Sequence, residues 1–459
     1  MLQVVPLAYS KDSVALFQTI AHLPGVVWLD SGRPASDMGR YDILSALPDT
    51  LLTPDLKPAE LSPFEFIQHA AGQLPHVEND DLPFTIGLLG YFSYETERSA
   101  ATASAFSANS RLSAKPKLAE NPEFIWGIYK HSIVVDHHTQ QTFFCYWQDG
   151  TNTSALRLLD LITHKKTERQ KSSGFSIGEM TSIVDWESYR HNFKLIKNNI
   201  LMGNTYQVNY TNPHWCEYSG DCSLAYQYLR NHLPSPYSGF LSFGETHILS
   251  FSPEQFIEKF GNKVITKPIK GTRQRKADPL EDAKQQQALM ASIKDRAENL
   301  MIVDLLRNDL GKVATAGSVR ADLLFELQSF ANVHHLVSTV SCTTDENTQA
   351  MSVLESAWPG GSITGAPKKR AMSVIDQVEP YQRGVYCGSI GYLTPGGNLN
   401  TNLCIRTIVA DQHKLVCWAG GGIVADSEVQ SEYEEALGKI ETLLSGLSAF
   451  QTINRKAFD

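Results

Sequence analysis

The sequence of 459 residues lacks the features that mark several large classes of protein. No apolar run approaches the roughly 18 residues of a membrane-spanning helix, and the N-terminus has no basic start followed by an apolar stretch and a cleavage site. The 40 lysines and arginines are outnumbered by 49 acidic residues, and the net charge of −9 does not favour a nucleic-acid surface. We therefore expect a globular, cytoplasmic protein whose partner is neither a membrane nor a nucleic acid.

The sequence also lacks the signatures of several common chemistries. Its seven cysteines are odd in number, scattered and never spaced as CxxC, which argues against a disulfide framework and against a zinc site. It contains no GxxxxGK[ST], GxGxxG, HExxH or GxSxG motif. ATP binding, dinucleotide binding and serine-hydrolase chemistry are therefore not predicted.

The order of strand and helix patterns predicts the fold class. Aromatic and β-branched strand patterns at 84–95 and 124–147 precede a polar stretch at 163–182, and further strand patterns alternate with helices after it. A helix is expected to begin after Asp185 as N-cap and to end at Gly203 as C-cap. Further helices are expected at 281–307, 347–357, 367–377 and 428–446. Strands arranged as meanders with helices between some of them favour an α+β fold.

Two of the expected helices carry pairs of acidic residues at helical spacing. Asp295 and Glu298 are three residues apart, and Glu432 and Glu435 repeat that spacing four residues before Lys439. Two helices that each present a carboxylate would suit a hard cation such as Mg²⁺. Acids at this spacing also occur on ordinary solvated helix faces, so the spacing by itself leaves both interpretations open.

Glycine-rich segments and isolated charges form a second set of candidates. The segments "PGGSITGAPKKRAM" and "AGGGIV" would expose backbone N–H groups that suit an anion. Arg406 alternates with apolar neighbours in "LCIRTIV", which favours either a buried salt bridge or a contact to a substrate anion. Glu254 follows a strand and a Ser-Pro turn and would be a general acid only if burial raised its pKa.

Lys270 lies in the basic segment "KPIKGTRQR", residues 267–275. The segment also carries Lys267, Arg273 and Arg275, so Lys270 is either one more charge at a strand end or a nucleophile. A nucleophilic lysine needs a lowered pKa, which burial beside Ile269 and nearby cations would provide.

Taken together and in order, these segments resemble the chorismate-utilising enzymes. The similarity extends over about 185–447 and is carried by "SPEQF", "KPIKGTRQR", "AENLMIVDLLRNDLG", "HHLVSTV", "GGSITGAPKKRAM", "RGVYCGSIGY", "NLCIRTI", "AGGGIVADS" and "SEYEEALGK". The segments "WLDSGRPASDMGRYDIL" and "GLLGYFSYE" resemble the amine-forming branch of this family. The resemblance implies large antiparallel sheets packed as a β-sandwich with helices on the outside. It implies an N-terminal region at 1–165, a linker at 166–182 and a catalytic domain at 183–447.

Within the family the residue before Gly-Thr distinguishes two amination reactions. Anthranilate-forming enzymes have alanine there, whereas this chain has lysine, as do the enzymes that make 4-amino-4-deoxychorismate for p-aminobenzoate and folate. The resemblance implies that Lys270 forms a covalent adduct at C2 of chorismate before ammonia enters at C4. Gln207 takes the place of the lysine base that isochorismate and salicylate synthases use, which argues against those reactions.

The resemblance also implies roles for particular residues. Glu254 is expected to protonate the leaving C4 hydroxyl, and Mg²⁺ is expected on Glu298 and Glu435 with help from Asp295 and Glu432. The expected substrate-binding residues are Thr272, His335, Ser362, Tyr386, Arg406, Gly420, Gly421, Gly422 and Lys439. An L-tryptophan pocket is expected from Ser31, Pro234, Ser235, Pro236 and Tyr237, and we expect binding there without regulation.

The source of nitrogen and two alternative functions complete these expectations. The chain has no motif for a glutaminase nucleophile, so we expect a separate glutamine amidotransferase subunit to supply ammonia. Anthranilate formation is the first alternative, and a non-catalytic tryptophan-binding subunit is the second. Loss of the acidic residues would favour the second, but Glu254, Glu298 and Glu435 are all present.

Overall fold

The computed structural model describes residues 1–36, 38–77, 81–96, 115–150, 152–164, 174–330 and 333–451. Residues 166–173 of the expected linker lie outside these ranges. The rest of the expected linker forms two short strands, β9 (Phe175–Ile177) and β10 (Thr181–Ser182), which pair with β11 (Gln207–Gly220).

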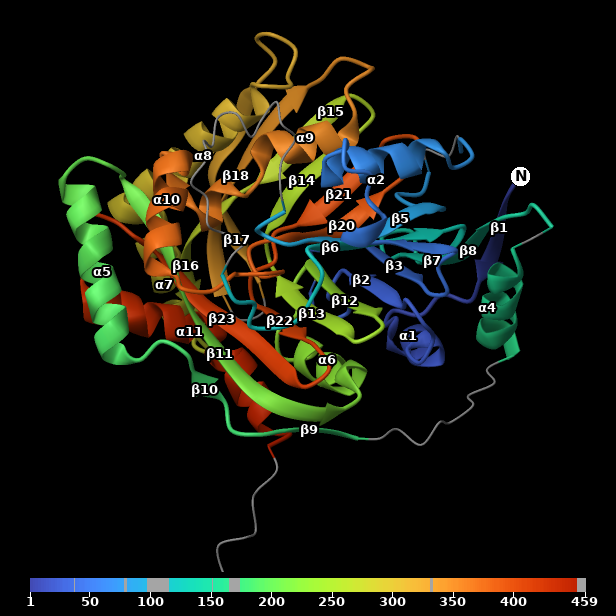
Figure 1. Ribbon diagram of the computed structural model, residues 1–459, viewed down its shortest axis with the longest axis horizontal. Helices are drawn as coiled ribbons and strands as arrows, with labels where there is room; N and C mark the ends of the chain where they lie inside the picture. Colours follow the sequence, from blue (N-terminus) through green and yellow to red (C-terminus); the bar gives the residue numbers. More distant parts are fainter. Residues whose placement is uncertain are drawn as a thin grey trace, which may run out of the picture.

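Two large antiparallel sheets form the body of the molecule (Figure 1). The first sheet runs in the order β1 (Leu2–Leu7), β8 (Gln141–Trp147), β7 (His131–Asp136), β3 (Tyr41–Ser45), β2 (Val27–Asp30), β12 (Tyr237–Phe243), β13 (Thr246–Ser252), β22 (Thr407–Ala410), β23 (Lys414–Ile423), β11 and β10, with β19 (Gly365–Ala366) also paired to β11. The second runs β16 (Ile269–Gln274), β18 (Val333–Thr343), β15 (Lys263–Lys267), β14 (Gln255–Phe260), β21 (Leu399–Asn402), β20 (Ser389–Leu393), β5 (Gly87–Phe92), β6 (Phe124–Tyr129) and β4 (Thr50–Leu52), with β17 (Arg320–Ser329) also paired to β18. Both sheets therefore combine strands from before and after residue 166.

Strand periodicity explains why the two sheets pack face to face. Val27 and Ile43 belong to the core between the sheets, whereas the next residue on each strand, Trp28 or Leu44, belongs to a second core. Successive side chains of a strand point to opposite faces of the sheet. Two adjacent apolar residues on one strand therefore pack into the two different cores. The expected α+β sandwich is therefore confirmed.

Helices cover the outer faces of the sandwich. Buried residues of α1 (Val14–Ile20), α4 (Thr153–His164), α6 (Cys222–Arg230) and α11 (Val429–Ser448) contribute to the second core. The remaining helices are α2 (Pro63–Gly72), α5 (Trp186–Leu201), α7 (Pro279–Ala291), α8 (Ile293–Leu310), α9 (Ala350–Ala357) and α10 (Lys368–Val378), with short 3-10 helices η1 (Pro54–Leu56) and η3 (Gly361–Ile363). Helices α5, α10 and α11 lie together beside β11 and β23 at the left of Figure 1.

Helix boundaries follow capping chemistry more closely than hydrophobic pattern. Asp185 caps α5 by accepting a hydrogen bond from the Ser188 backbone N–H, as expected, whereas the C-cap is Met202 and Gly203 follows it with a φ of +75°. The single helix expected at 281–307 is wrong. Ser292 is extended and caps α8 through its side chain, which accepts from the Asp295 N–H, so the segment breaks into α7 and α8.

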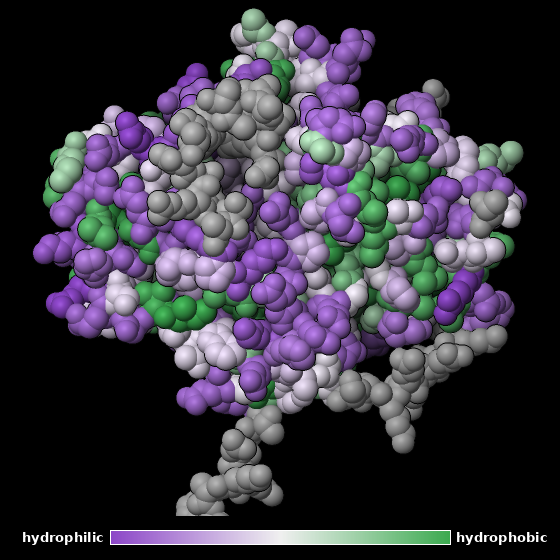
Figure 2. Space-filling view, viewed as in Figure 1, coloured by the Kyte–Doolittle hydropathy of each residue, from purple (hydrophilic) through white to green (hydrophobic). Residues whose placement is uncertain are grey.

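The surface is mixed, and no spanning segment is found. The face in Figure 2 is mostly hydrophilic, with hydrophobic residues in separate patches. Within the described ranges no helix has both the length and the apolar character needed to cross a membrane.

Candidate active site

A cavity of about 480 Å³ and a larger one of about 890 Å³ lie in the described part of the molecule, and the larger one contains most of the expected site residues. Its walls come from β11 and β23 of the first sheet, β16 and β18 of the second, η3, and helices α8 and α11. The expected residues that line it are Glu254, Lys270, Thr272, Asp295, Glu298, His335, Ser362, Tyr386, Arg406, Gly420, Gly422, Glu432, Glu435 and Lys439, together with Pro234 and Ser235. Side chains from distant parts of the sequence are thus brought to one site.

A β-bulge presents Lys270 to the cavity. The pairing of β16 with β18 shifts register between Lys270 and Thr272, so that Lys270 faces Leu336 and Thr272 faces His335. Gly271 has a φ of +83°, and a Cβ there would lie only 2.9 Å from a Leu289 methyl group and 3.0 Å from the Asp295 Cβ. Glycine is therefore required in "KGT", and the bulge lets consecutive residues reach the cavity wall.

The environment of Lys270 favours its neutral form. Burial lowers the pKa of Lys270 below its ordinary value, and Lys439 adds to this effect, whereas Glu298 and Glu254 oppose it. The Lys270 Nζ donates a long hydrogen bond of 3.4 Å to the Ser362 carbonyl. A lysine with these surroundings is more nucleophilic than an exposed one.

Glu254 is a buried acid joined to the same segment. Its side chain is 6% exposed, and the Ser362 hydroxyl donates to its Oε1 at 2.8 Å. Burial raises the pKa of Glu254 to about 7, against the lowering effects of the Ser362 hydrogen bond and the Lys270 charge. Glu254 therefore holds a proton in a large share of molecules at neutral pH, as a general acid must. The condition set by the sequence, a buried acid with a raised pKa, is met.

Arg406 and His335 form a second polar wall. Arg406 lines the cavity and has no carboxylate partner among the described residues, and its φ of +50° is rare for a residue with a side chain. The His335 Nδ1 lies 2.9 Å from the Thr272 hydroxyl, and its Nε2 is buried without a partner in the described chain. Burial lowers the pKa of His335 to about 3, so the ring is neutral. A half-buried guanidinium that lines a cavity without a carboxylate partner among the described residues is suited to a substrate carboxylate.

The glycine run of β23 forms an open wall. Gly420 and Gly422 line the cavity, and a Cβ at Gly420 would lie 3.0 Å from the Tyr386 hydroxyl. Gly421 does not line the cavity, and a Cβ there would approach the Lys439 Nζ at 3.5 Å. Behind Gly422 lies the fully buried Gln207, whose side-chain amide atoms have no partner in the described chain. A Cβ at Gly422 would clash with the Gln207 Nε2, so close packing requires glycine here, and the backbone of both glycines lines the cavity.

Four carboxylates of α8 and α11 face the cavity with lysines among them. Burial raises the pKa of Glu298, whereas Lys439 is the main cause of the lowered pKa of Glu435, which it contacts at 2.9 Å. Asp295 pairs with Arg273 at 3.0 Å, and Glu432 accepts from the Ser427 hydroxyl at 2.6 Å. Among the described residues no three acidic, histidine or cysteine side chains are grouped closely enough to enclose a metal.

This arrangement still fits Mg²⁺. Mg²⁺ prefers oxygen ligands and keeps several waters, and one or two carboxylates together with substrate oxygens hold it in many enzymes. Glu298 and Glu435 offer such oxygens on two helices around one cavity, and the raised pKa of Glu298 reflects a buried carboxylate that a cation would stabilise.

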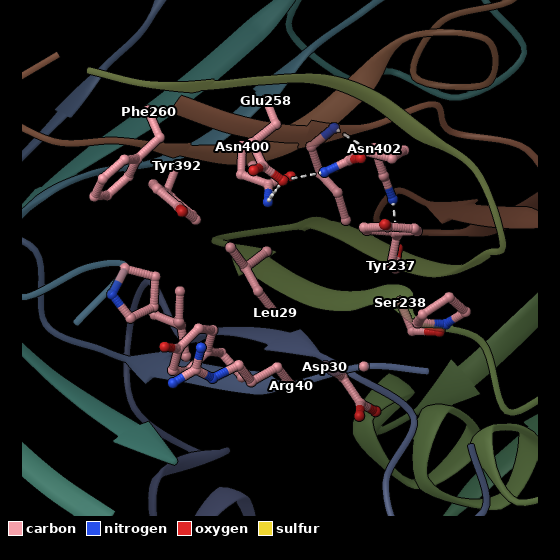
Figure 3. A pocket seen from close by; sticks show the side chains of 18 of the residues that line it. Leu29, Asp30, Arg40, Tyr237, Ser238, Glu258, Phe260, Tyr392, Asn400 and Asn402 are labelled. Carbon is pink, nitrogen blue, oxygen red and sulfur yellow. Dashed lines mark hydrogen bonds between the residues drawn. The ribbon is translucent and has the colours of Figure 1, made fainter. Parts of the chain in front are cut away.

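The residues expected to bind tryptophan are divided between two cavities. Pro234 and Ser235 line the larger cavity, whereas Pro236 and Tyr237 line the one of about 480 Å³. The Ser31 hydroxyl donates to Asp42 at 2.6 Å and lies behind the wall formed by Asp30. Figure 3 shows the smaller cavity, with Leu29, Phe260 and Tyr392 as apolar and aromatic walls and Asp30 and Glu258 as acids.

The sequence pattern missed several residues that line the larger cavity. Trp418 stacks on Tyr386 with ring centroids 5.3 Å apart and planes 2° apart. Asn209 stands two residues after Gln207 on β11, and Lys294 stands four residues before Glu298 on α8. Strand and helix periodicity would have found the last two once their neighbours were chosen. No local signal predicts the stacking partner of Tyr386.

Comparisons with known proteins agree with this site. The family model described as chorismate binding enzyme matches residues 27–445. The chain therefore belongs to the chorismate binding enzyme family. It is 37% identical, over 97% of its own length and 98% of the relative, to aminodeoxychorismate synthase component 1 of Escherichia coli (strain K12). It is 38% identical to aminodeoxychorismate synthase component 1 of Klebsiella aerogenes, over 94% of this chain and 96% of that protein.

A solved structure supports the same family. Anthranilate synthase component I from Streptococcus pneumoniae TIGR4 superposes with a TM-score of 0.76 and 25% identity, over 88% of this chain and 91% of that one. Family membership and an enzymatic role are thus established, as the sequence segments indicated.

Proposed function

We propose that the protein aminates chorismate at C4 and forms 4-amino-4-deoxychorismate, a precursor of p-aminobenzoate and folate. The observation that carries this proposal is Lys270, placed on a glycine bulge in the cavity wall and joined to Glu254 through Ser362. The relatives named aminodeoxychorismate synthase component 1 support the same reaction.

The first step is attack by the neutral Lys270 amine on C2 of chorismate. As the N–C2 bond forms, the two ring double bonds shift and the C4–O bond breaks. Glu254 gives its proton to the departing hydroxyl, which leaves as water. The lysine nitrogen becomes a secondary ammonium and keeps this positive charge until the second step, which makes it a neutral leaving group.

The second step reverses the shift. Ammonia bonds to C4, the double bonds return, and the C2–N bond breaks. The Glu254 carboxylate takes a proton from the incoming nitrogen, and the secondary ammonium leaves as the neutral Lys270 amine. Overall, chorismate and ammonia are converted to 4-amino-4-deoxychorismate and water. The Lys270 and Glu254 side chains return to their starting protonation states.

The chemistry depends on lowering the pKa of Lys270. A free lysine with a pKa near 10.4 is neutral in only about one molecule in 2,500 at pH 7. Burial of Lys270 and the charge of Lys439 shift this balance toward the amine. Glu254 must instead carry a proton to act as an acid, and burial in the same wall raises its pKa.

The cations and glycines of the walls would hold the substrate. Arg406 has no carboxylate partner in the described chain and is placed to pair with one carboxylate of chorismate. Lys439, whose Nζ also contacts Glu435 at 2.9 Å, and the backbone at Gly420 and Gly422 are placed to hold another anionic group, because all three residues line the cavity. His335 is neutral, so its free Nε2 adds a polar contact without charge.

Mg²⁺ is the metal that this site would hold. Glu298 and Glu435 are the proposed ligands, with Asp295 and Glu432 acting through water. When bound, the ion neutralises a substrate carboxylate and withdraws electron density from the conjugated diene. A separate glutamine amidotransferase subunit is the proposed source of ammonia, in keeping with the name component 1 of the relatives.

The product of the purified chain tests this function. With chorismate, ammonium and Mg²⁺, we expect 4-amino-4-deoxychorismate by liquid chromatography and mass spectrometry. EDTA should stop its formation and added MgCl₂ should restore it, and in Glu435→Gln the Mg²⁺ concentration for half-maximal rate should rise. Glutamine without an amidotransferase should not replace ammonium. Formation of fluorescent anthranilate as the main product would instead assign the first alternative function.

L-Tryptophan is the proposed ligand of the smaller cavity. Its aromatic walls at Phe260 and Tyr392 suit an indole ring, and the acid Glu258 suits an ammonium group. Calorimetric titration with L-tryptophan should give saturable binding that Tyr392→Ala weakens, with L-alanine as the control ligand. Because we expect no regulation, the rate of chorismate consumption should stay the same at saturation. Absence of binding, or a change in rate, would contradict this part of the proposal.

A further inference from the structure

Arg383 is a buried arginine behind the larger cavity that the proposed reaction does not use. Its side chain is 1% exposed. Its Nε and Nη2 donate to the two Glu379 carboxylate oxygens at 2.9 and 2.8 Å. Its Nη1 donates to the Ile363 carbonyl and its Nη2 also donates to the Asn209 carbonyl, both at 2.8 Å. The guanidinium therefore joins a carboxylate to the backbone of two further segments.

Both of these backbone contacts belong to cavity walls. Ile363 and Asn209 line the cavity, Ile363 from η3 and Asn209 from β11. Ser362 immediately precedes Ile363, and its hydroxyl donates to Glu254 while its carbonyl accepts from Lys270. The planar fork of an arginine fixes the directions of its hydrogen bonds, so it sets the position of η3 relative to β11.

Arg383 is itself held rigidly. The Glu379 Oε1 also accepts from the backbone N–H and the hydroxyl of Thr211, at 3.0 and 2.8 Å. The Glu95 carboxylate accepts from the backbone N–H groups of Arg383 and Gly384, at 2.6 and 3.0 Å. The ring of Tyr94 lies 4.8 Å from the guanidinium carbon. A side chain fixed from so many directions can transmit its position to its partners.

We propose that Arg383 is a positioning residue for the general acid and the nucleophile. By holding the Ile363 carbonyl it keeps η3 where the Ser362 hydroxyl meets Glu254 and the Ser362 carbonyl meets Lys270. It does not line the cavity and touches no reacting atom. This inference rests on the proposed function, because the roles of Glu254 and Lys270 are assigned there.

The free energy of folding does not by itself explain why Arg383 and Glu379 form a buried ion pair. Replacing a buried pair by well-packed apolar side chains is often neutral or stabilising, because burying two charges is costly. An apolar pair, however, could not hold two backbone carbonyls in a set direction. Arg383 is therefore better explained by the geometry that it maintains than by its contribution to folding.

A double-mutant cycle tests the proposal. Chorismate consumption with ammonium and Mg²⁺ is measured for the wild type, Arg383→Lys, Ser362→Ala and the double variant. Arg383→Lys should lower kcat by about 10- to 100-fold, because small misplacements of reacting groups have costs of this size, while KM for chorismate changes much less. In the Ser362→Ala background the same substitution should lower kcat by a smaller factor, because the hydroxyl contact to Glu254 is already lost and only the carbonyl contact to Lys270 remains to be displaced.

Arg230→Lys is the matched control. Arg230 is 4% exposed and is also in a buried ion pair, with Asp30 at 2.8 Å, but it does not line the cavity. Its variant should lose thermal stability without a fall in kcat per folded molecule. If Arg383→Lys does not fold, Glu379→Gln replaces it in the same cycle, because it weakens the hold on the guanidinium and preserves the volume.

Three outcomes would overturn the inference. These are fully multiplicative effects in the cycle, an equal fall in kcat for Arg230→Lys, and a change confined to KM. Because chorismate loss is measured whatever product forms, the cycle is informative even if product analysis of the wild type contradicts the proposed function.

Discussion

Replacing Lys270 by alanine is expected to reduce formation of 4-amino-4-deoxychorismate by at least about 10³-fold, in line with the cost of removing a covalent nucleophile. The reason is that, within the described part of the chain, no other amine is hydrogen-bonded to the Ser362 carbonyl next to Glu254. With C2 left open, ammonia can attack there, and we expect a small amount of anthranilate-type product. Chromatography of the products measures both effects in one experiment.

The covalent step has its own readout and a matched control. Wild-type protein incubated with chorismate and Mg²⁺ without ammonia, then digested and analysed by mass spectrometry, should carry chorismate less one water on Lys270. Lys267→Ala removes a lysine from the same segment whose side chain does not line the cavity, and it should keep the wild-type rate. Wild-type rates in Lys270→Ala, or an adduct on another residue, would rule out the covalent mechanism.

Replacing Glu254 by glutamine is expected to lower kcat by about 10²- to 10⁴-fold, the usual contribution of a positioned general acid. Glutamine keeps the size of the side chain and can still bond to Ser362, but it has no proton to give to the C4 hydroxyl. Since burial raises the pKa of Glu254 to about 7, the acid form is well populated at neutral pH.

The pH profile identifies the acid. The wild-type rate should rise with pH as the Lys270 amine forms and fall again once both Lys270 and Glu254 are deprotonated. In Glu254→Gln the rise should remain and the alkaline fall should disappear. Glu355→Gln is the control, because Glu355 is buried to a similar degree, 7% exposed, but does not line the cavity. An alkaline fall that persists in Glu254→Gln would assign the acid to another group.

Much of the fold could be predicted because strand periodicity is local. The patterns at 84–95 and 124–147 became β5 to β8, and the strand patterns that end at the glycine run became β21 to β23. Helix boundaries were less accurate. The break at Ser292 depends on a side-chain cap that competes with an otherwise continuous helical pattern, so the pattern alone could not reveal it.

The candidate site, like the fold, could be predicted from the sequence only in part. Glu254, Lys270 and Arg406 were chosen from sequence segments, and the structure places all three on one cavity. The expected tryptophan residues were chosen in the same way, yet Ser235 and Pro236 line different cavities although they are adjacent. Neighbouring residues of an extended segment point to opposite sides, and sequence segments do not state which side each residue faces.

The sequence by itself determined which chemical groups the protein has: a lysine before a Gly-Thr pair, two pairs of helical acids, an arginine among apolar residues and a glycine run. These are local choices, and their order along the chain indicated the family. Only the tertiary structure decided their chemical state. Burial of Lys270 and Glu254 in one wall lowers the pKa of the first and raises that of the second, because desolvation disfavours the charged form of each. The same folding brings Arg383 behind η3, where a residue for which the sequence predicted no role can hold the two reacting groups in place.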